Sequence, residues 1–214
     1  VNPFDTQLGF HYPTPQERAF LVNLLTLLTM PMGKTEPYDG MPDICGMVVD
    51  EAYRLYSPEK SPKRYSEHQD EKVDEAIRSL GLHTDGITTW WDITDELFKH
   101  GMVHEAILAQ RFAVPNMNDL TAVVQDQSFR DVYTKPKTAT SETIVDAFSR
   151  MIQSVLREYP VLTSTTRFDI GDARIVAIDL DEVAKSGGAA ADRRTGIMYM
   201  LGQFIGTRNF FFNE

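Results

Sequence analysis

The sequence predicts a mainly α-helical, multi-helix domain with a small β element near its C-terminus. Three observations support this fold class: apolar residues recur at helical spacing over most of residues 1–160, capping patterns precede several of these stretches, and one continuous apolar run follows at residues 174–180. Hydrophobic residues make up 42% of the chain and charged residues 24%, which is the composition of a folded globular protein.

The first predicted helix follows Thr14-Pro15-Gln16-Glu17, a capping box in which Thr14 is the N-cap and Glu17 the third helical residue. The second predicted helix begins at Pro42 and carries apolar residues at helical spacing as far as Tyr56. Each helix has one apolar face that needs a partner. The face of the first helix consists of Phe20, Leu21, Leu24, Leu25 and Leu28.

Four shorter helices are predicted next, and the polar residues 135–140 predict a linker after them. The helix that follows Thr89 is expected to bury Trp90, Ile93, Leu97 and Phe98. The four predicted helices are 73–80 closed by Gly81, 90–98 capped by Thr89, 102–112 after Gly101, and a short helix ending at Val124 with Asn116 or Asn118 at its cap.

The longest helical periodicity spans Ser141 to Tyr159, and a last helix is predicted from Ala189 to Phe204. Between them, residues 174–180 form an apolar run typical of a strand that is covered on both faces in a parallel sheet. A single strand cannot satisfy its own backbone, so we expect its sheet to lie outside this chain. The expected organisation is a helical domain at 1–160 and a strand and helix at 161–214, or one continuous domain.

Charge and cysteine content exclude several classes of function. The 21 Lys and Arg against 31 Asp and Glu give a net charge of −10, which argues against a nucleic-acid partner. The longest uncharged stretch, residues 19–33, is too short to cross a bilayer, so no transmembrane segment is expected. Cys45 is the only cysteine, which fits a reducing compartment, and a start at Val1 rather than at Met predicts a segment of a longer protein.

Two short motifs imitate parts of a nucleotide site. Gly33-Lys34-Thr35 matches the end of a phosphate-binding loop, but position 28 is Leu where that pattern needs Gly, and a helix rather than a strand precedes it. We interpret this tripeptide as a chance match. Residues 175–179, Ile-Val-Ala-Ile-Asp, imitate a strand whose terminal acid holds Mg²⁺, but without a phosphate loop Asp179 and Asp181 are interpreted as helix caps.

Two further groups could carry chemistry. His100 and His104 have the four-residue spacing of two zinc ligands on one helix, but Gly101 interrupts the pair, and no glutamate lies between them as a metalloprotease would need. We interpret both as surface histidines. Arg193 and Arg194 open the last helix after a Gly-Gly turn, and we hold them as residues that could contact a neighbouring subunit in trans. No catalytic, cofactor or metal residue is predicted in the chain.

Both ends of the chain resemble one family. The segment Asn2-Pro3-Phe4-Asp5-Thr6-Gln7-Leu8-Gly9, followed by Pro15 and Glu17-Arg18-Ala19-Phe20-Leu21, resembles the large type IV secretion and conjugation ATPases. It is most similar to their IcmB/DotO (TraU-like) branch. The stretches that also resemble this branch are residues 168–174, 179–184 and 191–201.

The resemblance implies that the chain lies between the two nucleotide-binding motifs of a hexamer-forming ATPase, with ATP and Mg²⁺ bound elsewhere in the parent protein. The β element would then be left over from the RecA-like sheet of that ATPase. The parent would act at the cytoplasmic face of the bacterial inner membrane, powering assembly of, or transfer through, a Dot/Icm-like channel. The segment itself would contact neighbouring subunits or other secretion components. The alternatives are a freestanding metal-dependent hydrolase built on His100 and His104 and a freestanding helical adaptor.

Overall fold

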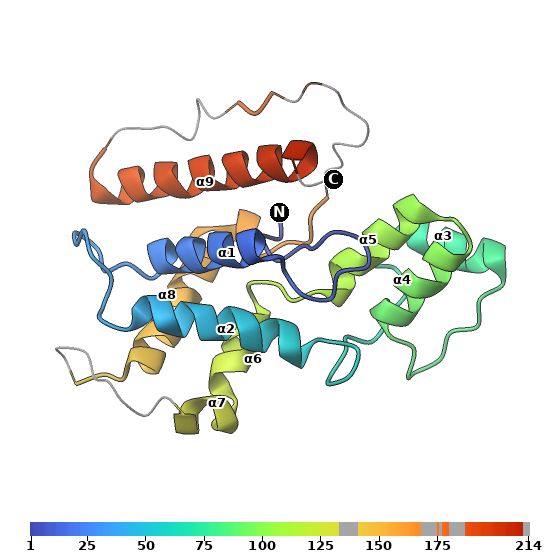
Figure 1. Cartoon of the computed structure of the whole chain (residues 1–214), viewed down its shortest axis with the longest axis horizontal. Helices are drawn as coiled ribbons and strands as arrows, with labels where there is room; N and C mark the ends of the chain where they lie inside the picture. The colour runs from blue at the N-terminus through green and yellow to red at the C-terminus, as the bar shows by residue number, and fades with distance from the viewer. Residues whose placement is uncertain (133–140, 168–174, 176, 180–186, 212–214) are drawn as a thin grey trace.

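The computed structural model describes residues 1–132, 141–167, 175, 177–179 and 187–211 (Figure 1). The described chain is mainly helical, which confirms the predicted fold class. Its helices are α1 (Pro15–Leu28), α2 (Met41–Leu55), α3 (Glu71–Leu80), α4 (Trp90–Lys99), α5 (Val103–Ala113), α6 (Asp119–Gln125), α7 (Gln127–Val132), α8 (Ile144–Glu158), a 3₁₀ turn η1 (Pro160–Leu162) and α9 (Ala189–Phe211).

Side-chain caps set where α1, α3, α4 and α8 begin. At α1 the Thr14 hydroxyl accepts from the Glu17 N–H at 3.3 Å and the Glu17 carboxylate accepts from the Thr14 N–H at 2.8 Å, so the predicted capping box is confirmed. Helix α8 begins at Ile144 rather than at Ser141, because Ser141 has a φ of 65° and Thr143 is the N-cap.

Of the two asparagines predicted at the cap of α6, Asn116 makes the side-chain bonds, whereas the outer face of α4 differs from the prediction. Asn118 makes no side-chain cap bond; instead, the Asn116 side chain accepts from the N–H groups of Asn118 and Asp119 at 2.9 and 3.3 Å. Phe98, predicted to be buried, is 56% exposed, since the neighbouring Leu97 is the residue that α4 turns toward the core. Trp91 of the same helix is buried, and its indole N–H donates to the Tyr56 carbonyl at 3.0 Å.

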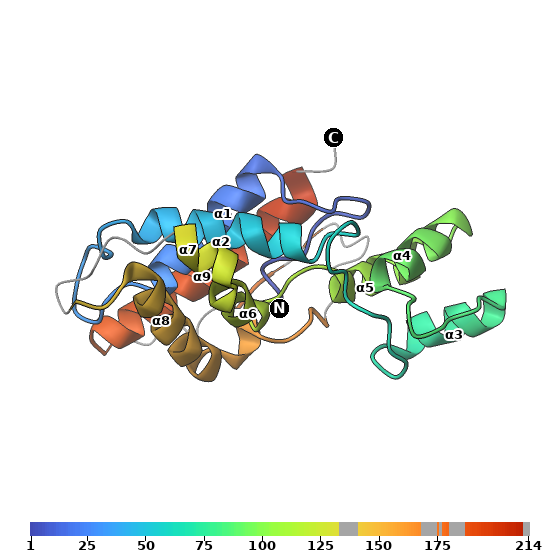
Figure 2. The ribbon, with the colours of Figure 1, turned by 90° about the horizontal axis from the view of Figure 1, so that it is seen from below.

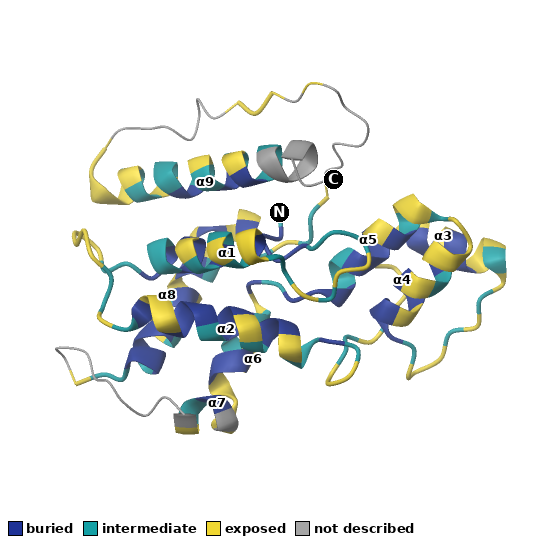
Figure 3. Cartoon of the chain, in the orientation of Figure 1, coloured by how far each residue is buried: buried dark blue, intermediate teal, exposed yellow. Residues whose placement is uncertain are grey.

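The buried apolar residues form two separate cores. The larger core joins α1, α2, α6, α7, α8 and α9, which we call the main bundle. The smaller core joins α3, α4 and α5, which we call the small module. Figures 1 and 2 show the small module at one end of the longest axis of the molecule, beyond α2. Figure 3 shows how each helix turns its buried side toward its own core.

The first ten residues, which we call the N-terminal arm, connect the two cores. Phe4 is fully buried in the main bundle, where its carbonyl accepts from the Tyr53 hydroxyl at 2.6 Å. Asn2 is also buried, and its side-chain amide donates to the Pro115 carbonyl at 2.8 Å. Further along, Leu8 packs against the core of the small module. The arm therefore contributes apolar side chains to both cores.

Gln110 of α5 holds the second half of this arm. Its side chain is 2% exposed, and its amide nitrogen donates to the Gln7 carbonyl at 2.8 Å and to the hydroxyl and carbonyl of Thr6 at 2.9 and 3.3 Å. Its amide oxygen accepts from the Gly9 N–H at 2.9 Å. One buried side chain thus satisfies several backbone groups of a segment that lies in no helix or strand.

Lys63 makes the other strong polar link between the two cores. Its ammonium lies 2.6 Å from an Asp119 oxygen at the start of α6, donates to the Val114 carbonyl at 2.8 Å and lies 5.0 Å from the centre of the Tyr56 ring. The backbone on either side of Arg64 pairs with that of Thr89 in an antiparallel bridge. The charged loop before α3 is thereby fixed against the N-terminus of α4.

Helix α9 lies along α1 in the antiparallel direction (Figure 1). The rings of Phe20 and Phe204 stack with centroids 3.8 Å apart, and a Cβ added at Gly196 would lie 3.8 Å from the Leu27 side chain. A Cβ at Gly196 would thus make only an ordinary van der Waals contact with Leu27, so glycine is not required there. Within the described residues, no helix combines the length and apolar character that a membrane span requires.

The predicted strand falls largely outside the described residues. Ile175 and residues 177–179 are described and lie in neither helix nor strand, whereas 174, 176 and 180 are not described. Ile175 is 90% exposed. The β-bridge between Arg64 and Thr89 lies elsewhere in the chain and offers these residues no partner. That residues 161–214 belong to an ATPase core stays a prediction.

Replacing Gln110 tests how firmly the N-terminal arm is held. We expect Gln110→Leu to lower the free energy of unfolding by about 2–4 kcal/mol, because it leaves buried backbone groups of the arm without partners. Urea unfolding followed by circular dichroism measures this change. The exposed Gln153 of α8 supplies the control, since Gln153→Leu should change the free energy by less than about 0.5 kcal/mol. If Gln110→Leu lowered the free energy of unfolding no more than Gln153→Leu does, Gln110 would not hold the arm in solution.

Candidate functional site

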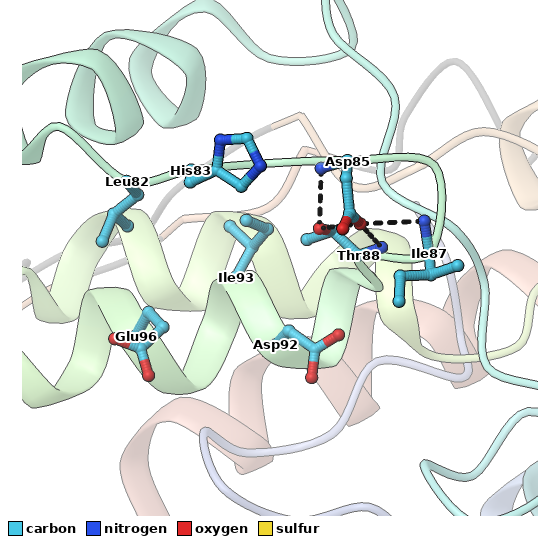
Figure 4. Close-up of a pocket in the computed structure, with 8 residues that line it drawn as sticks. All are labelled: Leu82, His83, Asp85, Ile87, Thr88, Asp92, Ile93 and Glu96. Atoms are coloured by element: carbon cyan, nitrogen blue, oxygen red, sulfur yellow. Dashed lines mark hydrogen bonds between the residues drawn. The ribbon is translucent and has the colours of Figure 1, made fainter.

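A hollow of about 380 Å³ opens on the small module, between the loop that precedes α4 and the outer side of α4 (Figure 4). Its volume lies at the low end of the range of ligand pockets, about 300–1,000 Å³. The lining combines apolar, acidic and hydroxyl side chains with one histidine. The lining residues are Leu82, His83, Asp85, Ile87, Thr88, Asp92, Ile93 and Glu96.

A tight turn at Asp85 shapes the upper wall of this hollow. One oxygen of Asp85 accepts from the N–H groups of Ile87 and Thr88 and from the Thr88 hydroxyl, each at 3.0 Å, as the dashed lines of Figure 4 show. The backbone bond from Ile87, followed by the Thr88 hydroxyl, lowers the pKa of Asp85. The turn leaves the Ile87 side chain 70% exposed at the rim.

The acidic residues of α4 form the opposite wall. Asp92 completes a capping box with Thr89, whose N–H and hydroxyl both donate to one Asp92 oxygen, at 2.8 and 2.7 Å. One turn later, one oxygen of Glu96 accepts from the Lys99 ammonium at 2.6 Å, and this bond lowers the pKa of Glu96. Each of the two carboxylates is therefore held in place through one of its oxygens.

The lining of the hollow combines acidic and apolar side chains. Three carboxylates and a histidine surround an apolar floor of Leu82 and Ile93, and Ile93 is almost fully buried. The hydroxyl of Thr88, which also lines the hollow, donates to Asp85 and so belongs to the turn. In the described chain, no cluster of three or more His, Cys, Asp or Glu has the arrangement of a metal site.

The two histidines at zinc-ligand spacing lie at the turn between α4 and α5. His100 is the C-cap of α4, and its Nδ1 lies 2.8 Å from the Glu96 carbonyl, which is the contact of a capping side chain. Gly101 has a φ of 77° and separates the two helices, so His104 belongs to the first turn of α5. Both histidines are exposed. The structure does not place them on one helix.

The Gly33-Lys34-Thr35 tripeptide follows the C-terminus of α1. The Lys34 N–H donates to the Pro31 carbonyl at 3.1 Å, closing a turn, and the next helix begins only at Met41. A phosphate needs the N–H groups of a helix N-terminus, whereas this end of α1 presents carbonyl oxygens. These residues do not fit ATP, and we derive no nucleotide step from them. The second motif that imitates part of a nucleotide site is the run at residues 175–179, with Asp179 and the nearby Asp181. Asp179 is exposed, and Asp181 lies outside the described residues.

The structure separates the roles of Arg193 and Arg194. The Arg193 guanidinium donates to the Leu28 carbonyl at 2.5 Å and to the Met30 carbonyl at 3.3 Å, so it caps the C-terminus of α1. This intramolecular role is absent from the sequence interpretation. Arg194 is exposed and makes no ion pair with any described residue. A contact in trans stays a prediction for both arginines.

The hollow was missed by the sequence interpretation, which placed Ile93 on the apolar face of a predicted helix and assigned no role to Asp85 or Glu96. A signal was present in Asp85-Gly86-Ile87-Thr88, where an acid followed three residues later by Thr is typical of a side-chain-stabilised turn. The capping pair Thr89 and Asp92 follows directly. Nothing in the spacing indicates that this turn and α4 enclose a hollow, because that depends on how the loop folds back.

Removing the Lys99 ammonium should change the pKa of one carboxyl group of the hollow and leave the pKa of another unchanged. In Lys99→Ala we expect the pKa of Glu96 to rise toward its ordinary value, while the pKa of Asp85 stays low because its partners are Ile87 and Thr88. Carboxyl carbon NMR over a pH titration measures both. The stability that two such lowered pKa values add is present above the ordinary carboxyl pKa and is lost as the pH falls through the lowered values. An unchanged Glu96 pKa would mean that the ion pair does not form in solution.

The two neighbouring arginines of α9 should differ in their effect on stability. Arg193→Ala should lower the free energy of unfolding by about 1–2 kcal/mol, because the last carbonyls of α1 lose a charged donor. Arg194→Ala should change it by less than about 0.5 kcal/mol, because the side chain is exposed and unpaired. Urea unfolding of both variants compares them under identical conditions. Equal losses would contradict the capping role of Arg193.

Comparison of the chain with protein-family models, with curated proteins and with solved structures gives no match.

Proposed function

We propose that this chain is a non-catalytic helical segment of a type IV secretion ATPase of the IcmB/DotO branch, and that it serves protein contact within that machine. The parent would bind ATP and Mg²⁺ through motifs outside the chain, at the cytoplasmic face of the bacterial inner membrane. Its hydrolysis would power assembly of the secretion channel or transfer through it.

The single observation that carries the proposal is the pairing of α1 with α9. The N-terminal stretch that resembles the family includes α1, and the C-terminal stretch 191–201 lies in α9. These two helices pack antiparallel, with Phe20 stacked on Phe204 and Arg193 bonded to the end of α1. A segment inserted between two parts of one ATPase has to bring its own ends together, and this pairing does so.

The surface supports contact with proteins rather than with small molecules or nucleic acid. The net charge of −10 repels phosphate backbones. The described cysteine, Cys45, is buried, and burial raises the pKa of its thiol to about 11, so it is inert as a nucleophile. The hollow on the small module is open and acid-rimmed, which suits a side chain of another protein. A freestanding helical adaptor would use the same surfaces.

Two measurements separate these possibilities. In the genome that encodes the chain, the reading frame through Val1 and Glu214 should specify a phosphate loop upstream and an acid-ended strand downstream. Calorimetry should then find Mg-ATP binding by the product of the whole frame and no binding by residues 1–214 alone, because the chain lacks a phosphate cradle.

Two results would overturn the proposal. One is a reading frame bounded by the chain itself. The other is micromolar binding of Mg-ATP by the chain that Lys34→Ala abolishes, which would make the tripeptide a true phosphate site. Lys60→Ala is the matched control, since Lys60 is another exposed lysine in a loop.

A further inference from the structure

Met32 is the methionine of this chain that an oxidant reaches most easily. All nine methionines lie within the described residues, and Met32, just after the C-terminus of α1, is 63% exposed. Met41 and Met117 are fully buried. The remaining methionines are partly buried, namely Met30, Met47, Met102, Met151, Met198 and Met200. Because an oxidant has to reach the sulfur atom, Met32 should react first.

The sulfur of Met32 lies at the contact between α1 and α9. Nη1 of the Arg193 guanidinium lies 3.6 Å from Met32 Sδ and 3.3 Å from the Met30 carbonyl oxygen. Nη2 of the same guanidinium donates to the Leu28 carbonyl at 2.5 Å. A thioether is a weak acceptor, and the buried Nε of Arg193 has no hydrogen-bond partner among the described residues. The guanidinium that bonds α9 to the end of α1 is therefore only partly satisfied.

Oxidation of Met32 would give this guanidinium a strong acceptor. Hydrogen peroxide transfers one oxygen to a lone pair of the sulfur: the S–O bond forms as the O–O bond breaks, the sulfur loses two electrons, and the rest of the peroxide leaves as water. Turned toward Arg193, the sulfoxide oxygen would come within about 3 Å of Nη1, which is an ordinary hydrogen-bond distance. A hydrogen bond from a charged donor is roughly twice as strong as one between neutral groups.

We propose that Met32 is a reversible oxidation site, at which a peroxide converts the thioether into a sulfoxide that binds Arg193 and tightens the pairing of α9 with α1. A sulfoxide in a core disrupts packing, but Met32 is mostly exposed, so its oxidation removes little buried apolar surface. Methionine sulfoxide reductases return the sulfoxide to the thioether, which would remove the added bond. This modification uses only contacts within the chain and is independent of the proposed function.

Limited treatment of the chain with hydrogen peroxide, followed by mass spectrometry of its peptides, measures which methionine gains an oxygen. We expect Met32 to react at least about tenfold faster than Met41 or Met117, whose side chains are fully buried. In the oxidised chain the amide hydrogens of α9 should exchange roughly threefold more slowly or slower still, because the added bond opposes local opening of that helix. Treatment with both reductases, one for each sulfoxide epimer, should restore the original exchange rate.

Three variants assign this effect to the two side chains. Met32→Leu keeps an apolar side chain that cannot be oxidised, so peroxide should leave the exchange of α9 unchanged. Arg193→Ala keeps the sulfur but removes the donor, so Met32 should still be oxidised while the exchange of α9 does not slow. Met32→Gln places an amide oxygen where the sulfoxide oxygen would lie, so it should slow the exchange of α9 without any peroxide.

Four results would overturn the inference. They are oxidation of Met32 no faster than that of the buried methionines, exchange of α9 that stays the same or quickens after oxidation, equal slowing by peroxide in Arg193→Ala, and exchange in Met32→Gln as fast as in the unchanged chain. The last result does not depend on how far Arg193→Ala loosens α9, because Met32→Gln keeps the bonds from Arg193 to the carbonyls of Leu28 and Met30.

Discussion

The burial of the N-terminal arm between two cores is the constraint on which the rest of the structure depends. The arm has no secondary structure of its own, so its backbone groups need partners from elsewhere. Gln110 of the small module and Tyr53 of the main bundle provide them. Because these two side chains come from different cores, the arm fixes the position of the small module relative to the main bundle.

This constraint also determines where the hollow faces. The helices of the small module pack mainly against one another. The N-terminal arm and the ion pair between Lys63 and Asp119 fix the orientation of the module relative to the main bundle. With the module held this way, α3 and α4 project from one end of the molecule (Figure 1). The acidic rim is consequently presented away from α9 rather than covered by it.

The pairing of α1 with α9 explains why two adjacent arginines have different roles. Arg193 lies over the C-terminus of α1, where unpaired carbonyls attract a cation. Arg194 is the next residue of the same helix, where successive residues are turned by about 100°, and its side chain is exposed. Arg193 therefore stabilises the fold, whereas Arg194 makes no ion pair with any described residue. A contact of Arg194 with a neighbouring subunit stays a prediction.

The sequence by itself determined the helical fold class and most helix ends, because these depend on local patterns such as the capping boxes at Thr14 and Thr89. Only the tertiary structure decided the rest. In the tertiary structure the apolar residues form two separate cores, and Phe98 is exposed. Arg193 donates to the end of α1, and the turn at Asp85 encloses a hollow together with α4. Each of these depends on residues distant in the chain or on the path of a loop, and neither helical periodicity nor capping spacing carries that information.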